Sequence, residues 1–227
     1  MLVLNLHCAM TRKALRTLEP GKQLVDDVLI LLARMLVFDS TRLQWYLPTT
    51  FVADLLPMWC DNHWFLIVVD LSRKQLVYLD SLWSPTTKSK RQIRKFAIFM
   101  DDLLDNRAWY ANADTNKMEC SEFDIKEPEV VQQLPESNNC GIFVAQWMIM
   151  YHLFYDYDVE TYLTCNYNEL AHFPMILYEL SSNAFQFVTD YSRMRLANDM
   201  VLKYHNDNRM ETVEAILKYW RSFTTAP

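Results

Sequence analysis

Three side chains in this sequence could together form a thiol-based active site: Cys140, His63 and Asp80. Cys140 follows the polar turn 137–139 and precedes a mostly apolar run from 142 to 155. Serine and asparagine, which make up that turn, are frequent N-cap residues, so Cys140 is predicted to lie on the first turn of a helix. Unpaired N–H groups and the positive end of the helix dipole favour the thiolate there, which is the attacking form of cysteine. We therefore predict that Cys140 is a nucleophile, with a buried, inert cysteine at the start of a core helix as the alternative.

His63 is the predicted general base, because a hairpin brings an acidic residue to it. His152 lies about 18 Å from Cys140 along the same predicted helix and cannot reach the thiol. A tight turn centred on residues 72 and 73 would pair residue 65 with residue 80. Asp80 then lies diagonally across from His63 on one face of the sheet, at about 7–8 Å, which side chains can bridge. This geometry predicts a base with a carboxylate that orients it, and a purely structural histidine–aspartate pair fits the spacing equally well.

The elements expected to position these residues are a small sheet and several helices. The continuous apolar run 64–69 is typical of a central strand that is covered on both faces. Alternation and turn residues predict strands at 49–56, 64–71, 75–79 and 123–125. Apolar spacing predicts helices at 11–38 with a break at 19–21, and at 89–104, 142–155, 183–203 and 210–219. These elements indicate an α+β fold in a single domain, residues 1–227, with the C-terminal helices 183–220 part of it or packed on it.

The composition argues against several classes of function. With 22 basic and 28 acidic residues the net charge is −6, which argues against general nucleic-acid binding. The two glycines, Gly21 and Gly141, are too few for a P-loop or a dinucleotide-binding motif. The five cysteines are widely spaced and form no C-x-x-C pair, which fits a reducing compartment. We expect no metal, cofactor, secretory signal or membrane span, and a monomer located in the nucleus, the cytoplasm or both.

A family resemblance adds to this interpretation. His63-Trp64 is followed 17 residues later by Asp80-Ser81-Leu82, and then by a glutamine-bearing turn that runs into Cys140-Gly141-Ile142-Phe143. This order resembles the catalytic pattern of the ubiquitin-like-protein-specific (SUMO-specific or sentrin-specific) cysteine proteases. The segment 24–29 resembles that family's Trp-Leu-Asn-Asp element. The resemblance covers about residues 18–155, and the chain is most similar to the divergent plant and transposon-associated branch.

The resemblance implies a papain-like fold, with a central, mostly antiparallel sheet between helices. It also implies hydrolysis of a peptide or isopeptide bond after the glycine pair of SUMO or a related modifier, which would be the partner. Cys140 would attack the carbonyl, His63 would take and return the proton, and Asp80 would hold the imidazole. Trp64 resembles the family's aromatic lid over the glycine tail, and a core tryptophan is the alternative.

Two departures from the family pattern lie just before the nucleophile. The family's aspartate at this place is Asn139, which caps a helix about as well and adds no negative charge beside the thiolate. The family's oxyanion glutamine precedes the cysteine by six residues, where this chain has Leu134. We expect Gln133, one residue earlier, to supply the oxyanion donor, and Gln132 is the weaker substitute.

A third departure concerns the channel for the substrate tail. The tryptophan that opens the family's Trp-Leu-Asn-Asp element is Gln23 here, so one aromatic wall opposite Trp64 is missing. We expect a wider channel with a weaker grip on the two glycines. Asp26 is retained from the same element and is expected to meet a basic patch on the modifier.

Two hypotheses of different class follow. The first is an active thiol protease that removes SUMO or a related modifier, with another ubiquitin-like tail or a viral-type endopeptidase role as variants. The second is a catalytically degenerate relative that binds a modifier or another protein through the same groove. Labelling of Cys140 by a glycine-ended modifier vinyl sulfone would distinguish them.

Overall fold

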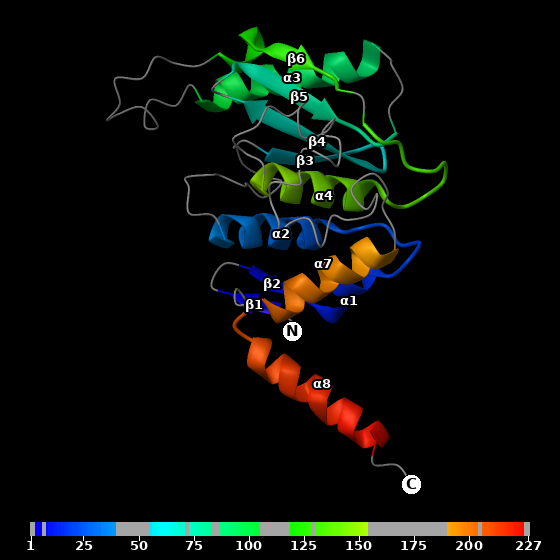
Figure 1. The fold of residues 1–227 in the computed structure, drawn as a ribbon. Helices are drawn as coiled ribbons and strands as arrows, with labels where there is room; N and C mark the ends of the chain where they lie inside the picture. The colour runs from blue at the N-terminus through cyan, green and yellow to red at the C-terminus, as the bar shows by residue number, and fades with distance from the viewer. Residues whose placement is uncertain are drawn as a thin grey trace, which may run out of the picture.

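A four-stranded sheet lies between two groups of helices (Figure 1). The computed structural model describes residues 3–5, 8–39, 55–70, 73–82, 87–104, 119–128, 130–153, 190–203 and 206–224. Strand order in the central sheet is β3-β4-β5-β6, and a separate antiparallel pair is formed by β1 and β2 near the N-terminus. The bounds of these strands are Val3–Asn5 (β1), Cys8–Met10 (β2), Leu55–Cys60 (β3), His63–Asp70 (β4), Gln75–Leu79 (β5) and Asp124–Lys126 (β6).

The register of β4 with β5 is the one that the sequence predicts. Leu66 pairs with Leu79 and Asp70 with Gln75, so a continuation of the ladder sets residue 65 opposite residue 80. Strands β3, β4 and β5 are antiparallel, whereas β6 runs parallel to β5. The mostly antiparallel α+β architecture expected from the sequence is therefore confirmed.

A second hairpin, between β3 and β4, was not predicted. Asp61 and Asn62 form its two-residue turn, with φ of 51° and 64°. Two left-handed residues in a two-residue loop give the I′-type turn that matches strand twist, and Asp and Asn tolerate that region well. The strand predicted at 49–56 consequently extends to Cys60, and its first part, 49–54, lies outside the described residues. This turn makes His63 the first residue of the central strand.

Alternate side chains of β4 point into two different cores. Trp64, Leu66 and Val68 pack with α2 and α4 in one core. Phe65, Ile67 and Val69 pack with α3 and the short 3-10 helix η3 in the other. The helices are α2, Asp26–Asp39, α4, Cys140–Leu153, and α3, Thr87–Leu104, with η3 at Cys120–Glu122. The prediction of a central strand covered on both faces is thus confirmed.

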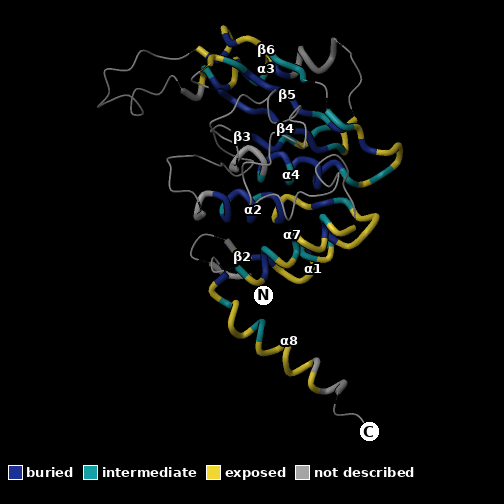
Figure 2. The backbone as a smooth tube through the Cα atoms, in the orientation of Figure 1, coloured by how far each residue is buried: buried dark blue, intermediate teal, exposed yellow. Residues whose placement is uncertain are grey.

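Helix α4 is mostly apolar and largely buried because it lies between the sheet and α2 (Figure 2). Gly141, the second residue of α4, lies against the segment that leads into α2, and this position requires a small residue. A Cβ on Gly141 would lie 2.8 Å from the Leu24 Cβ, closer than real carbon contacts. Gly141 therefore lets the start of α4 approach the segment that precedes α2.

The remaining helices lie beyond α2, on the side away from the sheet (Figure 1). The chain forms α1, Arg12–Leu15, and η1, Arg16–Leu18, and then an irregular link through the predicted break at 19–21 to α2. Helix α7, Asp190–Leu202, packs on η1 and α2. Helix α8, Arg209–Thr224, projects from the body and is mostly exposed (Figures 1 and 2).

The inward face of α7 agrees with the predicted one only in part, since Val201 is buried and Ala197 packs against the core as expected. Apolar spacing suggested Met194, Ala197, Val201 and Leu202, yet Met194 is 55% and Leu202 39% exposed. The buried positions are Arg193, Leu196, Met200 and Val201. The helix is rotated because an arginine, invisible to a hydrophobicity pattern, points inward and is hydrogen-bonded there. None of the described helices is long and apolar enough to cross a membrane.

Candidate active site

The base and its carboxylate come from two neighbouring strands. His63 begins β4 directly after the Asp61–Asn62 turn, and Asp80 follows the last residue of β5. His63 Nε2 lies 2.6 Å from Asp80 Oδ1, and their side chains are only 15% and 12% exposed. This contact confirms the pairing that the hairpin register predicted.

The Asp80 carboxylate is held on both oxygens. Tyr78 Oη donates to Oδ2 at 2.7 Å, and the Leu82 N–H donates to Oδ1 at 2.8 Å. With Nε2 of His63 committed to Asp80, the other ring nitrogen, Nδ1, is the one left for the thiol. The carboxylate therefore fixes both the tautomer and the ring plane of the imidazole.

Cys140 lies where the helix start was predicted. The Asn139 carbonyl accepts hydrogen bonds from the Ile142 and Phe143 N–H groups at 2.9 and 3.0 Å, so the helix begins at Cys140. Cys140 is 3% exposed, and its thiol faces His63 and the backbone N–H groups of Trp64 and Gly141, which lower its pKa. Strand β5 ends opposite Leu66, which leaves this end of β4 open to the thiol.

The electrostatics of the three groups favour a thiolate–imidazolium pair. Burial alone would raise the pKa of Cys140, but the hydrogen bonds from His63 and the two N–H groups outweigh it and lower that pKa. Burial would likewise lower the pKa of His63, yet its bonds to Asp80 and Cys140 raise it to about 9. Burial also opposes ionisation of Asp80, and the bonds from His63 and Tyr78 hold its pKa below the usual value. The arrangement is that of a thiol activated by a base with an orienting carboxylate.

The buried thiol of Cys120 behaves in the opposite way. Burial and the nearby Asp101 raise its pKa to about 11. Cys60, the third cysteine whose side chain is described, is half-buried and forms no disulfide within the described residues. Within the described residues no group of His, Cys, Asp and Glu side chains could hold a metal ion.

The polar residues before Cys140 do not cap the helix through their side chains as expected. Asn138 Nδ2 donates to the Gly21 carbonyl at 2.8 Å. Asn139 Oδ1 accepts from the guanidinium of Arg193 at 2.7 Å, and the buried Ser137 Oγ has no partner in the described structure. The turn is thus held by residues distant in sequence, which no local capping pattern reveals.

The two candidate oxyanion glutamines occupy different environments. Gln133 is buried, its Oε1 accepts from Ser81 Oγ, and its Nε2 donates to the Ser137 carbonyl, each at 3.0 Å. Gln132 is exposed and donates to the Asp80 carbonyl at 3.2 Å. Gln133 is therefore built into the turn that carries the nucleophile, with one of its two amide hydrogens committed to that turn.

The residues expected to line the tail channel lie beside the β3–β4 turn. Gln23 Nε2 donates to the Asn62 carbonyl at 2.9 Å, next to His63. Trp64 is only 1% exposed and its Nε1 donates to the Leu24 carbonyl at 3.1 Å, as expected of the core alternative. Its neighbour across the hairpin, Trp59, is 42% exposed, and the two ring centroids are 5.0 Å apart.

Trp59 is the accessible aromatic at this corner, and the sequence interpretation missed it because the β3–β4 hairpin was missed. The Asp61–Asn62 pair is the signal that could have placed it opposite Trp64. Asp26 is exposed at the first residue of α2.

Comparison with known proteins identifies a family. The sequence model of the Ulp1 protease family, C-terminal catalytic domain, matches residues 49–184, which is more than half of the chain and includes His63, Asp80 and Cys140. Sentrin-specific protease 2 of Homo sapiens is 32% identical over 93 residues, or 41% of this chain and 15% of that protein. Deubiquitinase and deneddylase Dub1 of Chlamydia trachomatis is 29% identical over 93 residues, or 40% of this chain and 21% of that protein. The chain thus spans a small part of the length of these relatives.

Solved structures share the fold. The C-terminal Ulp1 protease domain in complex with SMT3, the yeast ortholog of SUMO, superimposes with a TM-score of 0.56 at 17% identity, covering 88% of this chain and 86% of that one. A de-sumoylating protease gives a TM-score of 0.57 at 13% identity, covering 96% of this chain and 95% of that one. These similarities confirm the predicted papain-like α+β fold.

Proposed function

The chain belongs to the Ulp1 family of cysteine proteases, and from this membership we propose that it is a thiol-dependent peptidase or isopeptidase. It cleaves after the C-terminal glycines of SUMO or a related ubiquitin-like modifier. The observation that carries this proposal is the position of His63, which contacts Asp80 on one side and the Cys140 thiol on the other. A purely structural cysteine would not need this arrangement, as the raised pKa of the equally buried Cys120 illustrates.

The proposed reaction uses only groups of this chain and water. The Cys140 thiolate attacks the carbonyl carbon of the last glycine, and the oxyanion forms as the carbonyl π electrons move to oxygen. Imidazolium His63 gives its proton to the leaving amine as the C–N bond breaks, which leaves a thioester. His63 then takes a proton from water, and the resulting hydroxide displaces the thiolate and releases the carboxyl terminus. No cofactor is required.

The oxyanion requires preorganised donors. The Cys140 backbone N–H is one of the unpaired donors at a helix start and is the first candidate. We assign the second donor to Gln133, whose amide is buried beside the turn and has a second hydrogen beyond the one given to Ser137. Gln132 remains the weaker substitute, because its amide is exposed and donates to backbone carbonyls.

Substrate would enter beside the β3–β4 turn. Gln23 and Trp64 flank this corner as the proposed walls for the glycine tail, and the buried state of Trp64 leaves Trp59 as the more accessible ring. Asp26, exposed at the start of α2, is proposed to meet a basic patch on the modifier. We further propose that the chain acts as a monomeric, single-domain unit in the nucleus or cytoplasm on SUMO-type conjugates.

A second candidate function is a silent binding module for a modifier or another protein. Two observations favour it: the Gln133 amide is already hydrogen-bonded at both ends, and Trp64 is buried. The first feature would weaken catalysis directly, because it affects the oxyanion donor, and the second would weaken the positioning of the scissile bond.

The test is cleavage of a linear SUMO fusion that ends in Gly-Gly, followed by electrophoresis and mass determination of the product. We expect the wild-type chain to cut after the second glycine and Cys140→Ser to lose turnover while remaining folded. The matched control is Cys120→Ser, a second buried cysteine, which should cleave at the wild-type rate. A wild-type chain that binds the fusion but never cuts it would contradict the protease proposal and leave the binding module.

A further inference from the structure

Arg193 is a charged side chain in an unusual position. It lies on α7 and is 2% exposed, although arginine is rarely buried to this extent. A buried charge is tolerated only when its polar atoms are paired or hydrogen-bonded. The partners of this guanidinium should therefore reveal why it lies there.

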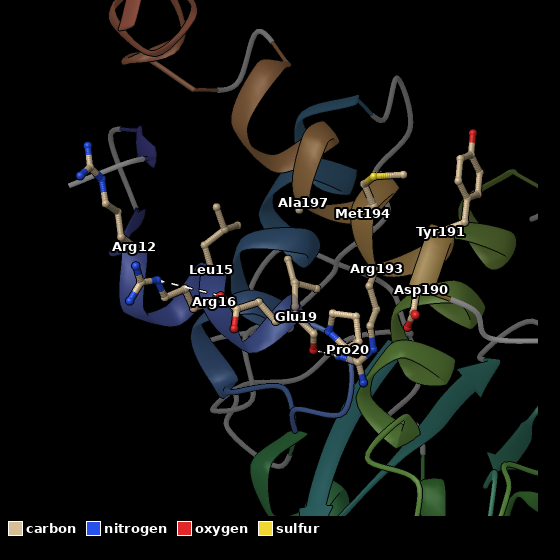
Figure 3. Close-up of a pocket in the computed structure, with 11 residues that line it drawn as sticks. Arg12, Leu15, Arg16, Glu19, Pro20, Asp190, Tyr191, Arg193, Met194 and Ala197 are labelled. Carbon is tan, nitrogen blue, oxygen red and sulfur yellow. Dashed lines mark hydrogen bonds and ion pairs between the residues drawn. The ribbon is translucent and has the colours of Figure 1, made fainter. Parts of the chain in front are cut away.

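Within the part of the chain that the structure describes, the hydrogen bonds of Arg193 go to neutral oxygens on two chain segments. Two of these oxygens belong to the turn before the nucleophile and two to the η1 region. The guanidinium donates to Asn138 O (2.8 Å), Asn139 Oδ1 (2.7 and 3.3 Å), Thr17 O (3.2 Å) and Glu19 O (3.3 Å). Figure 3 shows Arg193 extending from α7 toward Glu19 and Pro20, along one wall of a cavity of about 610 Å³.

We propose that Arg193 is a positioning residue for the nucleophile: it fixes the Asn138–Asn139 turn and adds a buried positive charge that favours the Cys140 thiolate. This inference rests on the proposed function, because it assigns Arg193 a part in preparing the same thiol. Arg193 touches neither the thiol nor the substrate path directly, and it acts through the residues immediately before Cys140.

The positioning step follows from the contacts of Asn139. Its carbonyl accepts the first hydrogen bonds of α4, while its side chain accepts two bonds from Arg193. A planar guanidinium that donates to one carbonyl and one amide at the same time fixes both distance and orientation. The direction in which α4 starts, and so the direction of the Cys140 side chain, depends on this contact.

The effect of the Arg193 charge on Cys140 depends on its hydrogen-bond acceptors, which are uncharged. Within the described residues no carboxylate contacts the Arg193 guanidinium. Burial lowers the pKa of Arg193, and the negative charges of Asp190 and of the Cys140 thiolate act in the opposite direction. Because arginine stays charged at any working pH, its field persists at the thiol, where screening by water is weak.

The other charged and titratable groups around the thiol can be separated from Arg193. His63 on β4 acts on the thiol, Asp190 on α7 acts on Arg193, and Arg12, Arg16 and Glu19 line the same cavity as Arg193. An aspartate at position 139 would pair with Arg193 and cancel its charge. Asn139 accepts the same bonds and leaves the charge to act on Cys140.

The test measures the reactivity of the Cys140 thiol in the absence of any modifier. The rate of iodoacetamide alkylation at Cys140, resolved by peptide mass spectrometry, is measured against pH in the full chain. We expect Arg193→Gln to raise the midpoint by about one pH unit, which slows alkylation about tenfold below the midpoint. Arg193→Lys, which keeps the charge, should have a pH midpoint close to that of the wild type. Arg195→Gln, an exposed arginine on the same helix, should match the wild type.

Circular dichroism and the thermal midpoint control for folding. A folded Arg193→Gln variant with the wild-type pH profile would overturn the proposal. If Arg193→Gln does not fold, the same measurement is made on Asn139→Asp. This variant should fold and should also raise the pH midpoint of alkylation. An unchanged midpoint would overturn the proposal. Because alkylation involves no substrate, a chain that fails to cleave SUMO could still pass this test, and the two proposals fail separately.

Discussion

The two sides of the Cys140 thiol are constructed differently. On the base side, His63, Asp80 and Tyr78 lie on adjacent strands of one sheet and are joined by hydrogen bonds of 2.6 and 2.7 Å. On the nucleophile side, Asn138 and Asn139 are held by Gly21 and Arg193, which lie 117 and 54 to 55 residues away in sequence. The base is positioned by local pairing, and the nucleophile by contacts between distant parts of the chain.

The two sides should therefore respond differently to substitution. The base side is fixed once the β4–β5 ladder forms, because the strand register sets the distance between His63 and Asp80. The nucleophile side requires α4, α7 and the segment before α2 to be packed together. Substitutions on the base side should therefore change chemistry and leave the fold unchanged, whereas loss of the long-range contacts of Asn138 and Asn139 should also lower stability.

The largest effect is expected for Asp80→Asn, which leaves the ladder intact but removes the carboxylate. The imidazole would then lose its orienting acceptor and adopt the wrong tautomer, and kcat should fall by up to about 10⁴, the loss typical of the same change in a Ser-His-Asp triad. Steady-state cleavage of a SUMO fusion measures it, with Asp124→Asn at the exposed start of β6 as the control. A fall of less than tenfold would mean that the strand pair does not orient the base.

The next effect is expected for Gln133→Ala on the nucleophile side. Loss of one oxyanion donor should lower kcat by about 10²–10³ with little change in KM. Ser81→Ala is the matched control, because it removes the 3.0 Å bond to Gln133 and keeps the donor. If Gln132→Ala proves as damaging as Gln133→Ala, the exposed glutamine is the donor and the assignment is reversed.

A pH profile of kcat/KM tests whether both sides act as one unit. Turnover should require the thiolate, so it rises through the lowered pKa of the Cys140–His63 pair, and it should fall as the imidazolium deprotonates near pH 9. Beyond either limit the rate should drop about tenfold per pH unit. A profile that keeps rising past pH 10 would show an ordinary, unpaired thiol.

Protein stability should follow the same histidine. The pKa of His63 is raised on folding, so its contribution to stability is complete below its unfolded value and is lost as the pH rises through about 9. Chemical denaturation at a series of pH values measures this loss. His63→Gln should abolish this part of the pH dependence.

The smallest effect is expected for Gln23→Trp, at the corner where the tail would enter. A second ring opposite Trp64 should raise kcat/KM on Gly-Gly tails by about 2- to 10-fold and sharpen the rejection of Ala-Gly and Gly-Ala tails. The tail series is measured on one modifier for wild type and variant. If the wild type rejects alanine as strictly as the variant does, another side chain already closes the channel, and Trp59 is the first to examine.

The sequence predicts the base side better than the nucleophile side for the same physical reason. Strand alternation and a tight turn are local, so they were enough to bring His63 and Asp80 together. The β3–β4 hairpin was missed although Asp61 and Asn62, both with positive φ, are typical of its turn. The family resemblance placed Trp64 in the channel, whereas Trp59 is the more exposed ring.

Arg193 could not be predicted from local patterns. Apolar spacing on α7 placed Met194 and Leu202 inward, and the charged residue just before them, Arg193, counts as solvent-facing in such a pattern. Its burial is possible only because Asn138, Asn139 and the η1 region supply oxygens, the farthest from a residue 176 positions away. Such a site becomes visible only when the tertiary structure is known.

The central claim is that Cys140 is an activated nucleophile at the end of a path for a glycine tail. Incubation with a glycine-ended SUMO vinyl sulfone, followed by peptide mass spectrometry, tests it most directly. The account predicts one adduct per chain, on Cys140, absent from His63→Ala and retained in Cys120→Ser. A chain that binds the probe without labelling, or that is labelled equally on Cys60 or Cys120, would contradict it.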